Sequence, residues 1–294
     1  MELNFRNISI EDKNIFERIS NKNMSSESAF GTSYIWSETF GLKICFLENF
    51  VLKKIISNLR YEFPRGDFRD IQGLKDSILL LKSDSSEFGK FEIQNMIESE
   101  VKTLQKILPG KFSYKEDRNN FEYIYSIESL ANLSGKKYHS KRNHISKFNK
   151  LYNWKYTSNL KSEKCLEFFQ KWFEYNTSEE KNSKKGEYLA IKKAIDNFNF
   201  LKLSIGLIEM EGEIIACTIG EKLSDDVLIV HFEKAFSEYE GAYSVINNEF
   251  CKNQIGKYKL VNREEDMGIP GLRKSKLSYK PKFLLKKYIA TWEE

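Results

Sequence analysis

The sequence predicts an α+β protein with two domains in tandem, each built from a mixed, mostly antiparallel sheet flanked by helices. Three observations support this fold class. The chain of 294 residues is long enough for two domains of ordinary size. Hydrophobic residues make up 40% of it and aromatic residues 14%, which is typical of folded globular proteins. Helix-like and strand-like segments also alternate along both halves.

The first half begins with a helix-like segment and ends with a strand-like one. Residues 8–19 have isoleucine and phenylalanine at helical spacing, and Ser9 is a favourable N-cap. Residues 121–127, FEYIYSI, are rich in aromatic and β-branched residues, which indicates a strand that closes this half. Between them we expect strands around LKICFLEN and FVLKKII, and helices over 69–83 and 93–107.

The second half has a clearer order of elements. Residues 201–236 predict three consecutive antiparallel strands with turns at Glu211-Gly212 and Ser224-Asp225-Asp226. The other expected elements are helices over 161–175, 187–198 and 241–253, a strand over 258–262, a short helix from Pro270, and a terminal apolar strand, KFLLKKYIA. This order matches that of a GNAT acyltransferase domain from its first helix onward, and the first half resembles a less distinct version of it.

A strongly basic segment joins the two halves. Residues 131–162 contain eight lysines and arginines and no acidic residue, although the net charge of the whole chain is only +5. We therefore expect an N-terminal GNAT-like domain over 1–132, a basic connecting helix over 133–155, and a C-terminal GNAT-like domain over 156–294.

Three longer strings carry a family resemblance: LSGKKYHSKRNHISKF (133–148), HFEKAFSEYEGAYSVINNEF (231–250) and VNREEDMGIPGLRKSKLSYKP (261–281). They resemble an uncharacterised bacterial family related to the C-terminal domain of phosphatidylglycerol lysyltransferase. The resemblance implies two GNAT-type domains in tandem and acyl or aminoacyl transfer chemistry. The membrane-spanning half of full lysyltransferases is not found in this sequence, so the resemblance does not carry lipid modification with it.

The basic helix has an apolar stripe of Tyr138, Ile145, Phe148 and Tyr152, which faces a core. Acidic partners at i+4 are absent from it, so its cations are either solvated or bound to an anion. One interpretation is a connecting helix with a structural role only. The other is an electropositive wall for a phosphate-bearing donor. The residues predicted to bind the donor are Lys137, Lys141, Arg142 and His144.

A second cluster of charges follows the strand that ends at Asn262. Carboxylates and cations alternate in a loop there, just before a helix begun by Pro270. This pattern predicts catalytic acids or bases at Glu264 and Asp266, with Tyr279 as a proton donor. The structural alternative is a turn held by mutual ion pairs. The donor-binding cations predicted in this segment are Arg263, Arg273 and Lys276.

The third candidate region lies around the last of the three antiparallel strands. His231 and Glu233 share one face of that strand, and His231 is either a catalyst or a buried structural histidine. Gly241 stands where a GNAT domain binds the pyrophosphate of its donor on backbone N–H groups. Glu238 and Tyr243 depart from the usual acetyl-CoA signature, which counts against ordinary acetyl-CoA binding. Asn247, a poor helix former within a predicted helix, indicates a buried hydrogen-bonding role.

Other features limit the possible functions. The four cysteines form no CxxC pair, and Cys165 and Cys217 lie among apolar neighbours, so we expect buried free thiols and no metal site. No apolar run is long enough for a membrane span, and the amino terminus lacks the apolar region of a signal peptide, which predicts a cytoplasmic protein without integral membrane association.

These expectations combine into one preferred function and one alternative. The preferred function is an acyl or aminoacyl transferase that moves its group to an amine or hydroxyl. It has no tightly bound cofactor, and its co-substrate is aminoacyl-tRNA, recognised at the acceptor stem, or acyl-CoA, with no DNA partner. The alternative is a non-catalytic protein that binds nucleic acid or an anionic surface and retains a transferase fold.

Overall fold

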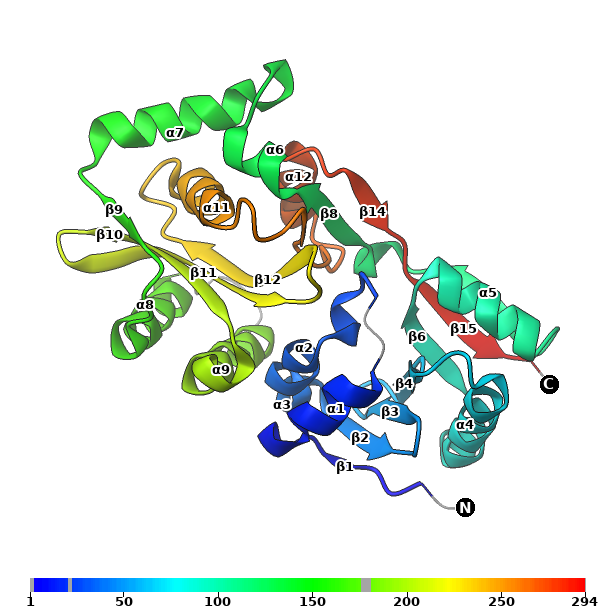
Figure 1. Cartoon of the computed structure of the whole chain (residues 1–294). Helices are drawn as coiled ribbons and strands as arrows, with labels where there is room; N and C mark the ends of the chain where they lie inside the picture. The colour runs from blue at the N-terminus through cyan, green and yellow to red at the C-terminus, as the bar shows by residue number, and fades with distance from the viewer. Residues whose placement is uncertain (1–2, 21–22, 176–180, 294) are drawn as a thin grey trace. The chain divides into compact units, whose positions relative to one another are not determined.

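The computed structural model describes residues 3–20, 23–175 and 181–293, and the chain divides into two compact units (Figure 1). The first unit contains Met1–Glu122, Glu265–Ile269 and Leu285–Glu294. The second contains Tyr123–Glu264 and Pro270–Leu284. The chain therefore enters the second unit at Tyr123, upstream of the predicted division at residue 132, and returns twice to the first unit near its end.

Among the described residues, the first unit is built on a sheet with the strand order β1-β2-β3-β4-β6-β15-β7, and β5 pairs with β3. All neighbours run antiparallel except β4 and β6, where Tyr61 lies opposite Ile93 and Glu62 opposite Gln94 in a parallel pair. The strands are β1 (Arg6–Asn7), β2 (Leu42–Phe46), β3 (Phe50–Ile55), β4 (Arg60–Glu62), β5 (Arg65–Gly66), β6 (Glu92–Met96), β7 (Phe112–Glu116) and β15 (Tyr288–Trp292).

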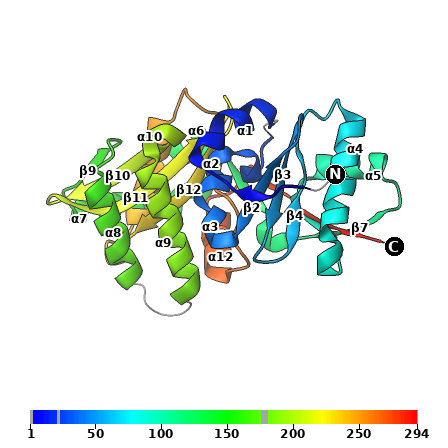
Figure 2. The same cartoon turned by 90° about the horizontal axis from the view of Figure 1, so that it is seen from below.

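The helices of the first unit lie on both faces of this sheet, with α1–α3 on one side and α4 on the other (Figures 1 and 2). Leu74, Ile78 and Leu104 of α4 and α5 are fully buried in its core. The predicted helix over 93–107 is wrong at its start, because Ile93 and Gln94 pair with β4 and Met96 pairs with β15. The Glu100 carboxylate accepts from Ile97 N, and the helix begins at Glu98. The helices are α1 (Lys13–Ile19), α2 (Phe30–Ile35), α3 (Ser37–Phe40), α4 (Ile71–Asp84) and α5 (Glu98–Ile107).

The second unit is built on a sheet with the order β14-β8-β13-β12-β11-β10-β9 in the described chain. The three predicted antiparallel strands are confirmed as β10 (Ser204–Met210), β11 (Glu213–Lys222) and β12 (Val227–Ala235). Most of their residues are buried because helices cover both faces of the sheet. The remaining strands are β8 (Glu122–Ser126), β9 (Lys155–Thr157), β13 (Leu260–Asn262) and β14 (Phe283–Leu285).

The helices of the second unit separate into two layers. In Figure 1, α7 and α11 lie on one face of the sheet and α8 and α9 on the other. The basic segment is helical as predicted, and Phe148 of its apolar stripe is fully buried. The helices are α6 (Ile127–Asn132), α7 (His139–Leu151), α8 (Ser162–Tyr175), α9 (Lys181–Asp196), α10 (Phe198–Leu201), α11 (Ala242–Asn253) and α12 (Pro270–Ser278).

Each sheet contains a strand from the opposite half of the sequence. The segment FEYIYSI does not close the first half, because β8 pairs with β13 in the second sheet, where Tyr125 lies opposite Val261. The predicted single terminal strand KFLLKKYIA is also wrong. It divides into β14, in the second sheet, and β15, which pairs with β6 and β7 in the first. The charged pair Lys286-Lys287 separates the two strands.

The fold class is confirmed, because both units have a mixed, mostly antiparallel sheet flanked by helices, as GNAT-like folds do. Each sheet includes a parallel pair, β4 with β6 in the first and β12 with β13 in the second. The predicted buried thiols are also confirmed, since all four cysteines are buried and free.

Candidate active site

In the second unit, the parallel strands β12 and β13 diverge after a short paired segment. Pairing of β12 with β13 ends at Ile229 and Asn262, whereas β12 continues to Ala235. Past this point Glu233 of β12 and Arg263, the residue after β13, form an ion pair with Nη2 2.6 Å from Oε1. The divergence thus places two charged side chains beside the first turns of α11.

Asn247 of α11 completes a polar cluster with this ion pair. Its Nδ2 donates to the second carboxylate oxygen of Glu233 at 3.0 Å, as the predicted buried hydrogen-bonding role requires. Within the described residues, Arg263 Nη1 and Asn247 Oδ1 have no hydrogen-bond partner, although both atoms are buried. Native proteins satisfy nearly all such groups. One donor atom, Arg263 Nη1, and one acceptor atom, Asn247 Oδ1, thus lie beside Glu233 and can each form a further hydrogen bond.

Aromatic rings enclose the Arg263 guanidinium. Its centre lies 4.8 Å from the ring centroid of Tyr279 and 5.5 Å from that of Tyr125. Burial opposes the charge, but Glu233 more than offsets this effect and raises the pKa of Arg263. Burial also raises the pKa of Tyr279 to about 12, and its hydroxyl lies 3.5 Å from Ser244 Oγ. The Tyr279 phenol therefore stays protonated at neutral pH and is not a base.

Lys141 approaches the other side of this cluster from α7. Its Nζ lies 3.7 Å from the ring centroid of Tyr279. Burial, with repulsion from Arg263, lowers the pKa of Lys141 to about 8, while Glu233 acts in the opposite direction. The sequence places Lys141 among the donor-binding cations of an outward wall, whereas in the structure its amine turns inward.

His231 and Glu264, both predicted as catalytic, lie together. His231 Nδ1 is 3.0 Å from Glu264 Oε1, and Nε2 is 3.1 Å from Glu221 Oε2. The imidazole is completely buried. Burial opposes protonation, yet the hydrogen bonds that the ring donates to the two carboxylates raise the pKa of His231 to about 9. Both ring nitrogens are occupied, so this geometry fits a structural imidazolium.

The loop after β13 is held in a strained conformation. Glu264 has φ 53°, in the left-handed region that is uncommon for a non-glycine residue. Its N–H donates to Asn262 Oδ1 at 2.8 Å, and the buried Lys276 Nζ donates to the carbonyls of Arg263 and Glu264. Lys276, predicted to bind the donor, therefore caps backbone carbonyls and stabilises this loop.

The remaining predicted residues of this segment lie elsewhere. Asp266 belongs to the first unit, and its buried carboxylate accepts from Arg118 Nη1 at 3.0 Å and from Gly268 N at 2.9 Å. Arg273 lies on α12 with a half-buried side chain. The structure thus brings Glu264, Arg263 and Tyr279 into the second unit and leaves Asp266 in the other.

The other predicted donor-binding residues of the basic segment have three different environments. Lys137, predicted to bind the donor, is exposed in the turn before α7. Arg142 Nη1 donates to the carbonyls of Leu133 and Gly135 and so caps the end of α6. His144 presents its backbone carbonyl to Gly241, where an added Cβ would lie only 2.6 Å from the carbonyl oxygen. Helix α7 therefore covers the start of α11.

Replacement of Arg142 by alanine tests its capping role. Loss of the guanidinium leaves two carbonyls without their charged donor, so we expect unfolding free energy to fall by about 1–3 kcal/mol in urea titrations. Lys150→Ala on the same helix serves as the control and should change stability by less than about 0.5 kcal/mol. Unchanged stability with loss of anion binding in Arg142→Ala would instead support the donor-binding role predicted from the sequence.

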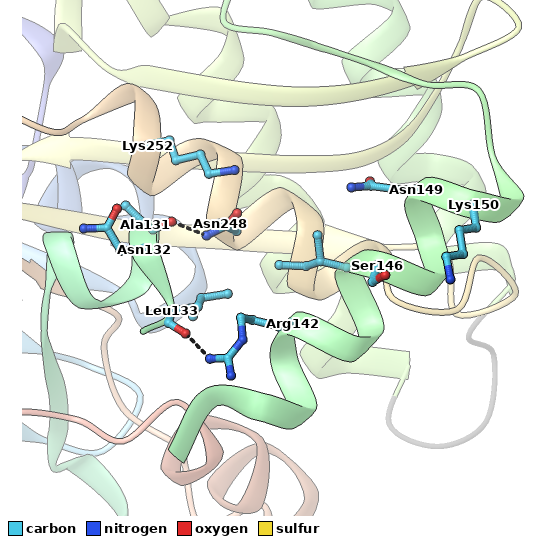
Figure 3. A pocket seen from close by; sticks show the side chains of 10 residues that line it. Ala131, Asn132, Leu133, Arg142, Ser146, Asn149, Lys150, Asn248 and Lys252 are labelled. Atoms are coloured by element: carbon cyan, nitrogen blue, oxygen red, sulfur yellow. Dashed lines mark hydrogen bonds between the residues drawn. The ribbon is translucent and has the colours of Figure 1, made fainter. Parts of the chain in front are cut away.

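An open cavity of about 380 Å³ lies between α6, α7 and α11, and we call it the α7–α11 groove (Figure 3). Figure 3 shows Arg142 pointing to the Leu133 carbonyl and Asn248 to that of Ala131. Among the described residues that line the groove, none is acidic. Its basic lining side chains are Arg142, Lys150 and Lys252.

Among the described residues, no group of three or more His, Cys, Asp and Glu residues is arranged to hold a metal ion. Across the same ranges, no helix combines the length and the apolar character needed to cross a membrane.

The mixed sheets and the divergence of β12 from β13 place the protein in the class of GNAT-like transferase folds. The family to which the chain belongs is more specific than this class. The chain matches the family described as phosphatidylglycerol lysyltransferase, C-terminal, over residues 22–291, and it belongs to that family. Family and fold together point to an aminoacyltransferase-like or acetyltransferase-like function, as the sequence resemblance predicted.

Three known proteins are similar to this chain in sequence or in fold. A conserved protein of unknown function from Bacteroides thetaiotaomicron VPI-5482 is 31% identical, with a TM-score of 0.89 over 99% of this chain and 100% of that one. The C-terminal domain of a putative lysylphosphatidylglycerol synthetase from Agrobacterium fabrum is 10% identical and has a similar fold, with a TM-score of 0.65 over 97% and 92%. An uncharacterized protein of Mycoplasmoides gallisepticum is 27% identical over 183 residues, which are 59% of this chain and 56% of that protein.

Proposed function

We propose that this protein is an aminoacyltransferase that takes its aminoacyl group from a tRNA and passes it to an amine or hydroxyl acceptor. The reaction takes place in the second unit, where β12 and β13 diverge. The observation that carries the choice of donor is the contact between the His144 carbonyl and Gly241. A GNAT domain that uses acyl-CoA binds the pyrophosphate at the start of this helix, and α7 covers that position here.

In this proposal, basic residues on α7 and in the turn before it contact the phosphates of the donor. Lys136, Lys137 and Lys150 are exposed, and Lys150 also lines the α7–α11 groove. Cations without acidic neighbours on the same helix suit the closely spaced phosphates of an RNA backbone. Lys147 is partly neutralised by its ion pair with Glu240.

The polar cluster at the divergence suits the chemical step. As the acceptor attacks the aminoacyl ester, negative charge develops on the carbonyl oxygen, and a buried N–H donor aimed at that oxygen lowers the barrier. Arg263 Nη1 is such a donor, because it is buried and has no hydrogen-bond partner among the described residues. Glu233 holds the guanidinium through Nη2, so that Nη1 is directed elsewhere.

A comparison of donors tests the proposed function. We expect charged tRNA to raise the melting temperature and to lose its aminoacyl group in the presence of small amines, whereas acetyl-CoA does neither. Stabilisation by coenzyme A, with acetyl transfer and no response to tRNA, would overturn the choice of donor. RNA binding without turnover of any aminoacyl ester would favour the non-catalytic binding protein.

Removal of exposed cations from the basic segment should weaken RNA binding without altering the fold. For the double variant Lys137→Ala/Lys150→Ala, we expect the slope of log affinity against log salt to become shallower by about 2, one for each lost phosphate contact. Fluorescence anisotropy with labelled tRNA at several salt concentrations measures this slope. Lys102→Ala, an exposed lysine on α5, is the control and should leave the slope unchanged.

A further inference from the structure

We propose that Lys141, in its neutral amine form, accepts the proton of the attacking amine or hydroxyl during transfer. This role rests on the proposed function and assigns Lys141 to proton transfer in place of phosphate binding.

The position of Lys141 separates it from the exposed lysines of the basic segment. Its Nζ lies over the Tyr279 ring, 3.7 Å from the centroid, and its side chain is half-buried. In the part of the chain that the structure describes, Lys141 forms no ion pair with a carboxylate, whereas Lys147 on the same helix pairs with Glu240. An amine held against a ring and away from solvent is poorly placed to neutralise an RNA backbone.

The groups that face Lys141 favour loss of its proton. Arg263, after β13, contributes a second cation on the same Tyr279 ring, at 4.8 Å from its centroid. Glu233 of β12 opposes this effect, but its carboxylate is bound by Arg263 and Asn247. Tyr279 remains a neutral phenol, and Ser244 of α11 carries no charge. Burial and repulsion thus outweigh the attraction, and the pKa of Lys141 is lowered to about 8.

The other candidate bases of this unit are already engaged. His231 has both ring nitrogens bound to carboxylates, and the Glu264 carboxylate is one of these partners. A group whose pKa lies near the working pH makes the most effective general base. Lys141 fulfils this condition and lies on the same ring as Arg263, the proposed oxyanion donor.

The step balances without any other reactant. The nucleophile forms a bond to the ester carbonyl carbon while its proton moves to the Lys141 amine. The carbon–oxygen bond to the tRNA ribose then breaks, and the Lys141 ammonium returns the proton to the departing ribose oxygen. The lysine ends in its initial neutral form.

Substitution by arginine separates proton transfer from charge, because arginine keeps the cation but does not deprotonate in proteins. In single-turnover transfer from aminoacyl-tRNA, we expect Lys141→Arg to be about 100-fold or more slower than the wild type, in line with the loss of a general base. Its affinity for tRNA should change less than about threefold, as retention of the charge implies. Lys102→Arg, at an exposed lysine of the first unit, is the control and should transfer at the wild-type rate.

The pH profile and chemical labelling provide independent measurements. The wild-type rate should rise with pH and level off above about 8, following the pKa of Lys141. Lys141→Arg should lose this inflection. Competitive acetylation with acetic anhydride, read by mass spectrometry, should give Lys141 a midpoint near pH 8, below the ordinary range for lysine. Melting temperatures would identify a variant that fails to fold, and labelling of the wild type does not depend on any variant.

Three results would overturn the inference: transfer by Lys141→Arg within threefold of wild type, an unchanged pH profile, or a labelling midpoint near that of exposed lysines. A wild-type protein that transfers from no aminoacyl-tRNA, but shows the low labelling midpoint, would instead refute the proposed function and leave the amine as a base for another acceptor reaction.

Discussion

Replacement of Lys287 by methionine is expected to lower the unfolding free energy by about 3–5 kcal/mol, the usual cost of removing one partner from a buried ion pair. Lys287 is completely buried in the first unit. Its Nζ bonds to the Glu27 carboxylate, lies 3.1 Å from Glu122 Oε1, and donates to Ser25 Oγ at 2.6 Å. Methionine has a similar length but no charge, so two carboxylates would remain buried without their cation.

The ionisation of Glu27 shows how strongly this contact is coupled to folding. Burial alone would raise the pKa of Glu27, but the charge of Lys287 and its hydrogen bond lower it to about 2. Without the lysine, the burial effect dominates and the carboxyl takes up a proton more readily. The difference in stability between Lys287→Met and wild type should therefore shrink as the pH falls from 7 toward 4.

Lys286→Met, one residue earlier, is the matched control. Its amine is half-exposed and pairs with an equally exposed Glu116, and such surface pairs contribute about 0–1 kcal/mol. Urea unfolding of both variants at pH 7 and pH 4 measures the contrast. Equal stabilities for the two variants, or a pH-independent loss in Lys287→Met, would contradict the buried ion pair.

The distant partners of Lys287 also explain why the division of KFLLKKYIA between two sheets was not predicted from the sequence. The alternation and turn residues of 201–236 predict three strands whose pairing is local, and the structure has those strands. KFLLKKYIA also has strand character, but strand character does not specify which sheet a segment joins. The available signal was Lys287 directly before the apolar residues Tyr288 and Ile289, since a buried lysine requires carboxylate partners. These partners are Glu27 and Glu122, far away in sequence.

The candidate site was predictable in part. The alternating charges after Asn262 indicated the loop that supplies Arg263, and Asn247 was recognised as an unfavourable helix residue with a polar partner. The inward turn of Lys141 was missed, although it lies three residues after Tyr138 and seven before Phe148, on the buried stripe of α7. The roles of Ser244 and Tyr125 depend on contacts between distant elements, for which local spacing carries no signal.

Loss of the His231 proton at high pH is expected to have the second large effect on stability. Because its pKa is raised in the folded state, from an ordinary 6.5 to about 9, the folded protein binds this proton more tightly than the unfolded chain. The stabilisation is fully present below pH 6.5 and is lost as the pH rises through about 9. The shift corresponds to about 3 kcal/mol.

His231→Gln should therefore remove most of this dependence. The variant leaves Glu221 and Glu264 without the cation between them, so we expect it to be about 3–5 kcal/mol less stable at pH 6. The gap should narrow toward pH 10, where the wild-type imidazole has also lost its proton. Urea unfolding of both proteins from pH 6 to 10 measures this gap, and subtracting one from the other removes the titration of groups that do not contact His231. A constant gap would mean that His231 is neutral in the folded protein, and one ring nitrogen would then be available as a base, the catalytic role predicted from the sequence.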